Sequence, residues 1–113
     1  MKTLRPESVP AIGLHDAVAG LGVSGEAGPV TVTGVCLDSR MVRPGDLYVA
    51  LPGFHAHGAG FTTQAVERGA VAVLTDPEGA QIVEDAGVPV LISHRLRPVM
   101  AEVSARVYGE PAS

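Results

Sequence analysis

The sequence is poor in the residues that make a disulfide framework, a basic binding surface or a membrane span. Its one cysteine, Cys36, excludes an intramolecular disulfide and a multi-cysteine metal cage. One lysine and a net charge of −4 leave no basic stripe, so we expect no nucleic-acid partner. No run reaches the roughly 20 apolar residues that cross a bilayer. Charges and prolines stand at the amino terminus, where a secretory signal would need an apolar run. We therefore expect a cytoplasmic protein with no membrane partner.

The chain also lacks the phosphate-binding loop of common ATP-using enzymes. No G-x-x-x-x-G-K-[ST] sequence occurs, so we do not expect ATP hydrolysis by this chain alone. Residues 20–25 do match the dinucleotide pattern G-x-G-x-x-G. They follow a predicted helix and precede a predicted strand, however, which is the reverse of the order in a dinucleotide site. We interpret this segment as a flexible loop.

What the sequence does contain is an alternation of strand and helix patterns. Its length and its 46% hydrophobic content are typical of one folded domain. Strands are predicted at residues 30–37, 46–51, 71–74 and 88–92, and helices at residues 14–21, 60–70, 76–87 and 96–107. Asp76 is the predicted N-cap of the third helix, and Pro77 its first residue. Apolar strands joined by helices form parallel sheets covered on both faces. We predict an α/β fold, a single three-layer domain with a mixed, largely parallel sheet flanked by helices.

Two parts of this fold need separate predictions. The strands at residues 30–37 and 46–51 are joined by a turn around Pro44-Gly45 that is too short for a crossover helix, so we expect them to be adjacent, with antiparallel or mixed pairing. Residues 1–29 are expected to form a leader with a short helix and a Gly-rich loop. Residues 30–113 are then the domain proper.

Polar residues follow both of these strands, where α/β domains commonly hold ligands. After the first strand come Asp38, Ser39 and Arg40. We expect Asp38 to cap the following turn and Arg40 to pair with Asp38 or with Asp46, which would staple the loop. The Ser39 hydroxyl can donate and accept, which suits a ribose or uracil edge, and we expect it to bind a ligand and not to act as a nucleophile.

The loop at residues 52–58 follows the second strand. Phe54 and His55 offer an aromatic face and an imidazole beside backbone N–H groups, which suits a nucleotide base or a pyrophosphate. A surface loop without a ligand is the alternative from spacing alone. His55 and His57 could begin a metal site, but two other histidines and no cysteine cluster make a third ligand improbable, and we predict no metal.

Several segments together resemble a known family. They are G-V-C-L-D-S-R, R-P-G-D-L-Y-V-A-L-P-G, H-G-A-G-F, Q-A-V-E-R-G-A-V-A-V-L, P-V-L-I and V-Y-G-E-P. In this order they resemble the amino-terminal domain of the Mur ligases, and are most similar to the UDP-N-acetylmuramoyl-L-alanyl-D-glutamate:2,6-diaminopimelate ligase type. The resemblance covers residues 30–113, and its most specific part is D-S-R followed at fixed distance by P-G-D-L. The tail at residues 107–111 looks like the family's boundary before the central, ATP-binding domain.

The resemblance implies a division of labour. The family's first domain holds the UDP end of UDP-N-acetylmuramoyl-L-alanyl-D-glutamate, while ATP, magnesium and the incoming amino acid belong to the central and carboxy-terminal domains. The parent would be an ATP-dependent amide-forming ligase, and this chain alone would be inactive, with no catalytic residue, metal or cofactor of its own. The residues that the resemblance places at the substrate are Leu37 and Ser39 at the uridine, and Phe54, His55 and Ala56 at the nucleotide and its diphosphate.

Two alternatives stay open beside this interpretation. One is the amino-terminal domain of the neighbouring ligase that adds D-alanyl-D-alanine. The other is a stand-alone interaction module on the same scaffold, because a fold does not determine a function. The chain also departs from the family at one point, since the family commonly has Asp-Gly where this sequence has His57-Gly58.

Overall fold

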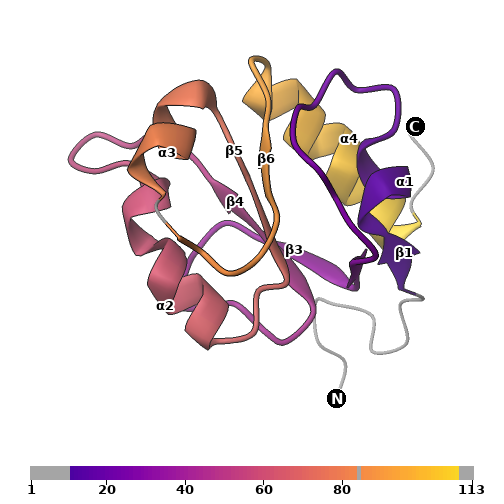
Figure 1. Cartoon of the computed structure of the whole chain (residues 1–113), viewed down its shortest axis with the longest axis horizontal. Helices are drawn as coiled ribbons and strands as arrows, with labels where there is room; N and C mark the ends of the chain where they lie inside the picture. Colours follow the sequence, from indigo (N-terminus) through magenta and orange to yellow (C-terminus); the bar gives the residue numbers. More distant parts are fainter. Residues whose placement is uncertain (1–10, 84, 110–113) are drawn as a thin grey trace.

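The computed structural model describes residues 11–83 and 85–109, and in it four parallel strands lie side by side in the order β3-β4-β5-β6 (Figure 1). The strands are β3 (Gly34–Cys36), β4 (Asp46–Ala50), β5 (Ala72–Thr75) and β6 (Val90–Ile92). The helices are α1 (Leu14–Val18), α2 (Thr62–Glu67), α3 (Pro77–Ile82) and α4 (Leu96–Tyr108), with a 3₁₀ turn, η1 (Gly58–Phe61), directly before α2. The prediction of an α/β domain with helices flanking the sheet is confirmed. The end of the V-Y-G-E-P tail, at residues 110–111, lies outside the described residues, as do residues 1–10 of the leader.

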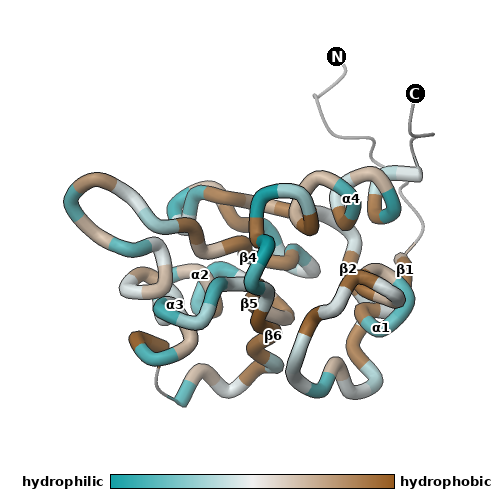
Figure 2. The backbone as a smooth tube through the Cα atoms, turned by 90° about the horizontal axis from the view of Figure 1, so that it is seen from above, coloured by the Kyte–Doolittle hydropathy of each residue, from teal (hydrophilic) through white to brown (hydrophobic). Residues whose placement is uncertain are grey.

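The sheet buries both of its faces, and successive residues of β4 divide between them. Leu47 and Val49 point into one apolar cluster with α1 and α4, and Tyr48 and Ala50 point into a second cluster with η1 and α2. All five residues of β4 and all four of β5 are buried. Seen from above, β4, β5 and β6 lie between α2 and α3 on one side and α1 with two short strands, β1 (Ile12–Gly13) and β2 (Thr31–Val32), on the other (Figure 2). This two-sided burial is why these strands are continuously apolar.

The pairing of β3 with β4 corrects one prediction. The two strands are parallel, with Val35 opposite Leu47, and not antiparallel. For parallel pairing, the chain must return from the end of β3 to the level of its start before β4 begins. Because β3 has three residues, this distance is only about 10 Å. The connection, residues 37–45, has nine residues and can span about 30 Å. Val42 in this connection is buried in the second cluster, and its carbonyl accepts a hydrogen bond from Arg68 Nε at 3.2 Å. A packed loop therefore replaces the crossover helix.

The predicted strand at residues 30–37 is in fact two strands. Its first part, β2 (Thr31–Val32), pairs antiparallel with β1 (Ile12–Gly13), and its second part is β3. Leu14 and Ala17 of α1 are fully buried in the same cluster as β4 and α4. The described part of the leader thus packs on the domain.

Three helices are shorter than predicted. The helix predicted at residues 14–21 ends at Val18, because Gly20 and Gly22 follow in the left-handed region at φ 77° and 71°. The helix predicted at residues 60–70 begins as the 3₁₀ turn and ends at Glu67. The third ends at Ile82 and not near residue 87. Its predicted start is confirmed, since Asp76 is the N-cap and accepts the Gly79 N–H at 2.7 Å.

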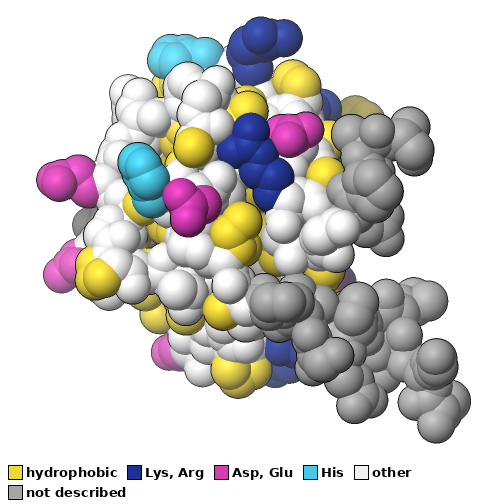
Figure 3. Space-filling model, turned by 90° about the vertical axis from the view of Figure 1, so that its right-hand side faces the viewer, with side chains coloured by type: hydrophobic (Ala, Val, Ile, Leu, Met, Phe, Trp, Pro, Cys, Tyr) yellow, Lys and Arg dark blue, Asp and Glu magenta, His cyan; other side chains and the backbone are white. Residues whose placement is uncertain are grey.

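The last helix, α4, confirms the helix predicted at residues 96–107 and buries an apolar stripe that consists of Leu96, Val99, Val103 and Val107. On its outer side, Arg106 Nη1 donates to the carbonyls of Asp16 and Ala19 at 3.1 and 2.8 Å, which fastens α4 to the end of α1. The face of the molecule on the right of Figure 1 carries acidic, basic and histidine side chains interspersed among apolar ones (Figure 3). Among the described helices, none has the length and apolar character that a membrane crossing requires.

Candidate functional site: a pocket at the carboxyl ends of the strands

A pocket of about 450 Å³ opens where β3 and β4 end. Its size falls within the range of small-ligand sites. The loops after both strands contribute to its wall, together with the start of the helical segment that follows. The lining residues are Leu37, Asp38, Ser39, Arg40, Tyr48, Leu51, Ala56, Gly58, Phe61 and Gln64. Parallel strands end at the same edge of the sheet, so the topology brings these two loops together.

Asp38 and Arg40 form the staple that the sequence predicts. The Asp38 carboxylate accepts the Arg40 backbone N–H at 2.9 Å and two guanidinium N–H groups at 3.1 Å each. These hydrogen bonds from Arg40 hold the pKa of the Asp38 carboxyl below its usual value and raise the pKa of the guanidinium. Arg40 is largely exposed and Asp38 is half-buried, so the pair shapes the loop more than it stabilises the fold.

Ser39 is buried at the floor of the pocket, with 6% of its surface exposed. Its hydroxyl donates to Gln64 Oε1 at 2.7 Å. This hydrogen bond uses the hydroxyl proton, but the lone pairs of the hydroxyl oxygen can still accept a hydrogen bond from a ligand. Gln64 lies on α2 and was not predicted, since a polar residue on the outer side of a helix carries no local signal of a site.

Tyr48 and Gly58 close the pocket on the β4 side. The Tyr48 hydroxyl donates to the Gly58 carbonyl at 2.7 Å, and the Gly58 N–H donates to the Leu51 carbonyl at 2.8 Å. Burial raises the pKa of the Tyr48 hydroxyl, which therefore remains a donor. A Cβ at position 58 would lie 3.0 Å from Leu51 N, so glycine permits this close approach of two backbone segments.

The five predicted site residues divide into two groups. Leu37, Ser39 and Ala56 line the pocket. Phe54 and His55 are not among its lining residues; both are exposed, on the loop that projects from the body of the molecule after β4 (Figure 1). The structure therefore brings three of the five together and leaves the other two outside the pocket, on the same loop as Ala56.

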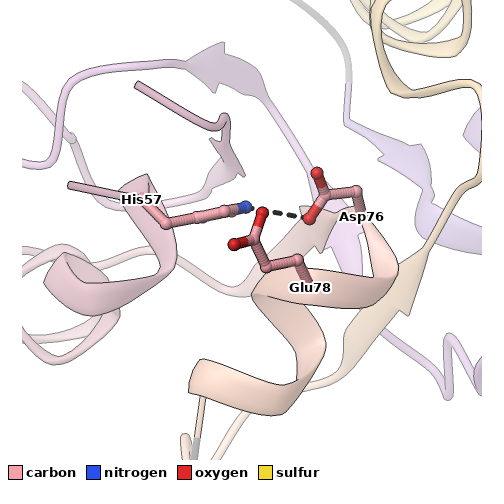
Figure 4. Close-up of side chains that lie close together, drawn as sticks. All are labelled: His57, Asp76 and Glu78. Atoms are coloured by element: carbon pink, nitrogen blue, oxygen red, sulfur yellow. Dashed lines mark hydrogen bonds and ion pairs between the residues drawn. The ribbon is translucent and has the colours of Figure 1, made fainter. Parts of the chain in front are cut away.

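His57 anchors this loop to the next strand end. Its side chain is 6% exposed; Nε2 lies 2.8 Å from Asp76 Oδ1, and Nδ1 accepts the Ala59 N–H at 3.0 Å (Figure 4). An N–H donor at Nδ1 requires that nitrogen to be unprotonated, so the proton is on Nε2 and is donated to Asp76. His57 thus caps η1 and ties it to the N-cap of α3, a role that sequence spacing alone did not indicate.

Asp76 receives this bond as a carboxylate. Burial acts to raise its pKa, but the hydrogen bonds from the Gly79 N–H and from His57 outweigh burial and lower the pKa below its ordinary value. Glu78 also lies near the pair, and ligand atoms of the three side chains are within 4.8 Å of one another. Both ring nitrogens of His57 are already in use, however, so a cation would have to break one of these hydrogen bonds. We call the hydrogen-bonded pair of His57 and Asp76, together with the bond from the Ala59 N–H, the latch, and its geometry indicates a structural role.

A histidine paired with an aspartate also invites comparison with a catalytic triad. The ring nitrogen that would act as a base, Nδ1, is occupied by the Ala59 N–H, and the Ser39 hydroxyl donates to Gln64. The geometry therefore gives no activated nucleophile at Ser39.

These features define an α/β domain that presents a small-ligand pocket at the carboxyl ends of parallel strands. Residues 31–108 match the family described as "Mur ligase family, catalytic domain". The chain is 49% identical over 107 residues to the UDP-N-acetylmuramoyl-L-alanyl-D-glutamate--2,6-diaminopimelate ligase of Streptomyces coelicolor, covering 95% of this chain and 21% of that protein. It is 46% identical over 107 residues to the UDP-N-acetylmuramyl-tripeptide synthetase of Leifsonia xyli subsp. xyli, covering 93% of this chain and 21% of that protein.

Solved structures agree on the fold. The crystal structure of MurF from Acinetobacter baumannii superposes with a TM-score of 0.59 at 20% identity, over 80% of this chain and 19% of that one. The chain belongs to the Mur ligase family. It spans about a fifth of the length of the curated relatives it matches.

Proposed function

We propose that this chain is the docking domain for a UDP-N-acetylmuramoyl-peptide in a peptidoglycan-precursor ligase. The intact enzyme would add meso-diaminopimelate or another diamino acid to UDP-N-acetylmuramoyl-L-alanyl-D-glutamate. The observation that carries the proposal is the pocket itself, because Leu37, Ser39 and Ala56 meet in it at the strand ends. Its apolar and hydroxyl-bearing walls suit a uracil and a ribose.

The charge around the pocket supports an assignment of the uridine to its interior. Among the described lining residues, Arg40 is the one cation, and it is held by Asp38. The diphosphate would then lie toward the exposed loop that carries Phe54 and His55. Phe54 is fully exposed, so a face of its ring is available to stack on the nucleotide.

The chemistry of the parent would lie in the remainder of the ligase. This sequence has no phosphate-binding loop with a lysine, so its residues do not fit ATP and magnesium. In the parent, transfer of the γ-phosphoryl group from ATP to the substrate carboxylate would form an acyl phosphate and release ADP. Attack by the amine of the amino acid would then form the amide and release phosphate. The contribution of this domain is to fix the UDP end of the substrate, which turns a bimolecular encounter into an oriented one. We expect the isolated chain to fold and to turn over nothing.

A second ligase of the family is the alternative parent. MurF from Acinetobacter baumannii, described as the D-alanyl-D-alanyl ligase, shares the fold at 20% identity. The 49% identity to a diaminopimelate ligase favours the first parent.

The proposal is tested by titrating the isotopically labelled chain with UDP and following its amide resonances. We expect shifts confined to residues 37–40, 54–58 and Gln64. Ser39→Ala removes one hydrogen-bonding group and should weaken binding about 2- to 12-fold, the equivalent of 0.5–1.5 kcal/mol. Ser104→Ala, on α4, is the matched control and should bind like the wild type. Absence of shifts at millimolar UDP would instead favour a stand-alone interaction module.

Catalysis is tested separately. Incubation of the chain with ATP, the UDP-linked dipeptide precursor and diaminopimelate should release no ADP above a blank without protein. Measurable ADP release would contradict the assignment of this chain to docking alone.

A further inference from the structure

The edge strand β3 has an unusual partner on its open side. In a parallel pair, alternate residues direct their N–H and C=O groups toward the neighbouring strand, and the residues between them direct theirs away. Val35 is the middle residue of β3, and both of its backbone groups meet the hydroxyl of Tyr108. The Val35 N–H donates to Tyr108 Oη at 2.9 Å, and the Tyr108 hydroxyl donates to the Val35 carbonyl at 3.3 Å.

The Tyr108 side chain therefore makes hydrogen bonds to the Val35 backbone of the kind that a fifth strand would make. Tyr108 is the last residue of α4, and Val107 beside it is 2% exposed in the core. Gly109 ends the helix in the left-handed region at φ 67°, so the tyrosine stands in a defined place. An edge strand of three residues has few hydrogen bonds of its own, and losing this pair would leave it close to fraying.

The strand that Tyr108 holds leads directly into the pocket. Leu37 is two residues beyond Val35, and Ser39 is four residues beyond it. Since side chains alternate along a strand, a slip or a twist of β3 would turn Leu37 away from the pocket and would pull the Ser39 hydroxyl from Gln64.

We propose that Tyr108 is a positioning residue for the nucleotide pocket, acting through β3 and touching no ligand. The identity of the ligand in this inference rests on the proposed function. The coupling between Tyr108 and the pocket through β3 does not depend on that function. It extends the site to the far end of α4, outside the set of lining residues.

The test uses amide hydrogen exchange of the whole chain together with UDP titration. In the wild type the Val35 amide should be protected; rapid exchange there would overturn the proposal whatever any variant does. In Tyr108→Phe, which keeps the ring and removes the hydroxyl, exchange at Val35 should become about 3- to 10-fold faster, because the hydrogen bond that protects the Val35 N–H is lost together with the longer one to the Val35 carbonyl. Affinity for UDP should fall by a similar factor, while amides of β5 and β6 keep their protection.

Arg106→Gln is the matched control. It lies on the same helix and loosens the contacts between α4 and α1 without touching β3. It should leave Val35 exchange and UDP affinity unchanged; equal effects of the two variants would show that general loosening of α4 is responsible and would refute the positioning role. If the wild type does not bind UDP, the proposed function fails, but faster exchange at Val35, Leu37 and Ser39 in Tyr108→Phe would still support the coupling.

Discussion

Replacing His57 by alanine tests whether the latch fastens the loop at residues 52–58 to the start of α3. The imidazole makes two hydrogen bonds that no other side chain among the described residues can supply, one to Asp76 and one from the Ala59 N–H. Alanine would leave the Ala59 N–H at the start of η1 without its cap. It would also take from the Asp76 carboxylate the His57 hydrogen bond, one of the interactions that lower its pKa.

The expected cost follows from these two losses. Loss of an N-cap costs about 0.5–2 kcal/mol, and loss of a hydrogen bond to a charged group about 1.5–3 kcal/mol. Together they predict that the free energy of unfolding falls by about 2–5 kcal/mol. With a urea m-value of about 2 kcal/mol per M, the midpoint should fall by about 1–2.5 M. His57→Asn should recover about 1 kcal/mol, because asparagine can cap η1 but is too short to reach Asp76.

Urea unfolding followed by circular dichroism measures these changes. His55→Ala is the matched control, two residues earlier on the exposed loop, and should stay within about 0.5 kcal/mol of the wild type. A double-mutant cycle with Asp76→Ala would isolate the coupling between the two side chains. If His57→Ala unfolds at the same urea concentration as His55→Ala, the latch contributes nothing and our reasoning about it is wrong.

Two further predictions concern the same latch. Gly79→Ala should lower the free energy of unfolding by about 1–3 kcal/mol, although alanine has the better helix propensity. The reason is that the new Cβ would meet Thr75 Oγ1 and would lie 2.6 Å from His57 Cε1. A urea midpoint equal to that of the wild type would contradict this close packing. Acid should also weaken the fold through Asp76. Since its folded pKa is lowered, its stabilising contribution is complete above the unfolded value of about 3.9 and is lost as pH falls below that value. Asp76→Asn should flatten this loss in urea unfolding between about pH 4 and 2, and an unchanged slope would count against the carboxylate.

Local sequence determined the elements whose partners are near in the chain. The Asp76-Pro77 start of α3, the Asp38–Arg40 staple and the apolar stripe of α4 all depend on residues within one or two turns of one another. The continuous apolar character of β4 and β5 likewise indicated a sheet covered on both faces. The α/β class was therefore predictable.

Only the tertiary structure decided the parallel pairing of β3, because pairing direction depends on the path of the connecting loop over the sheet and not on its length alone. The same holds for the long-range hydrogen bonds that shape the site. Ser39 and Gln64 are 25 residues apart, His57 and Asp76 are 19 apart, and Val35 and Tyr108 are 73 apart. None of these pairs has a periodic signal, since each side chain finds its partner only after the strands have brought distant backbone segments to one edge of the sheet.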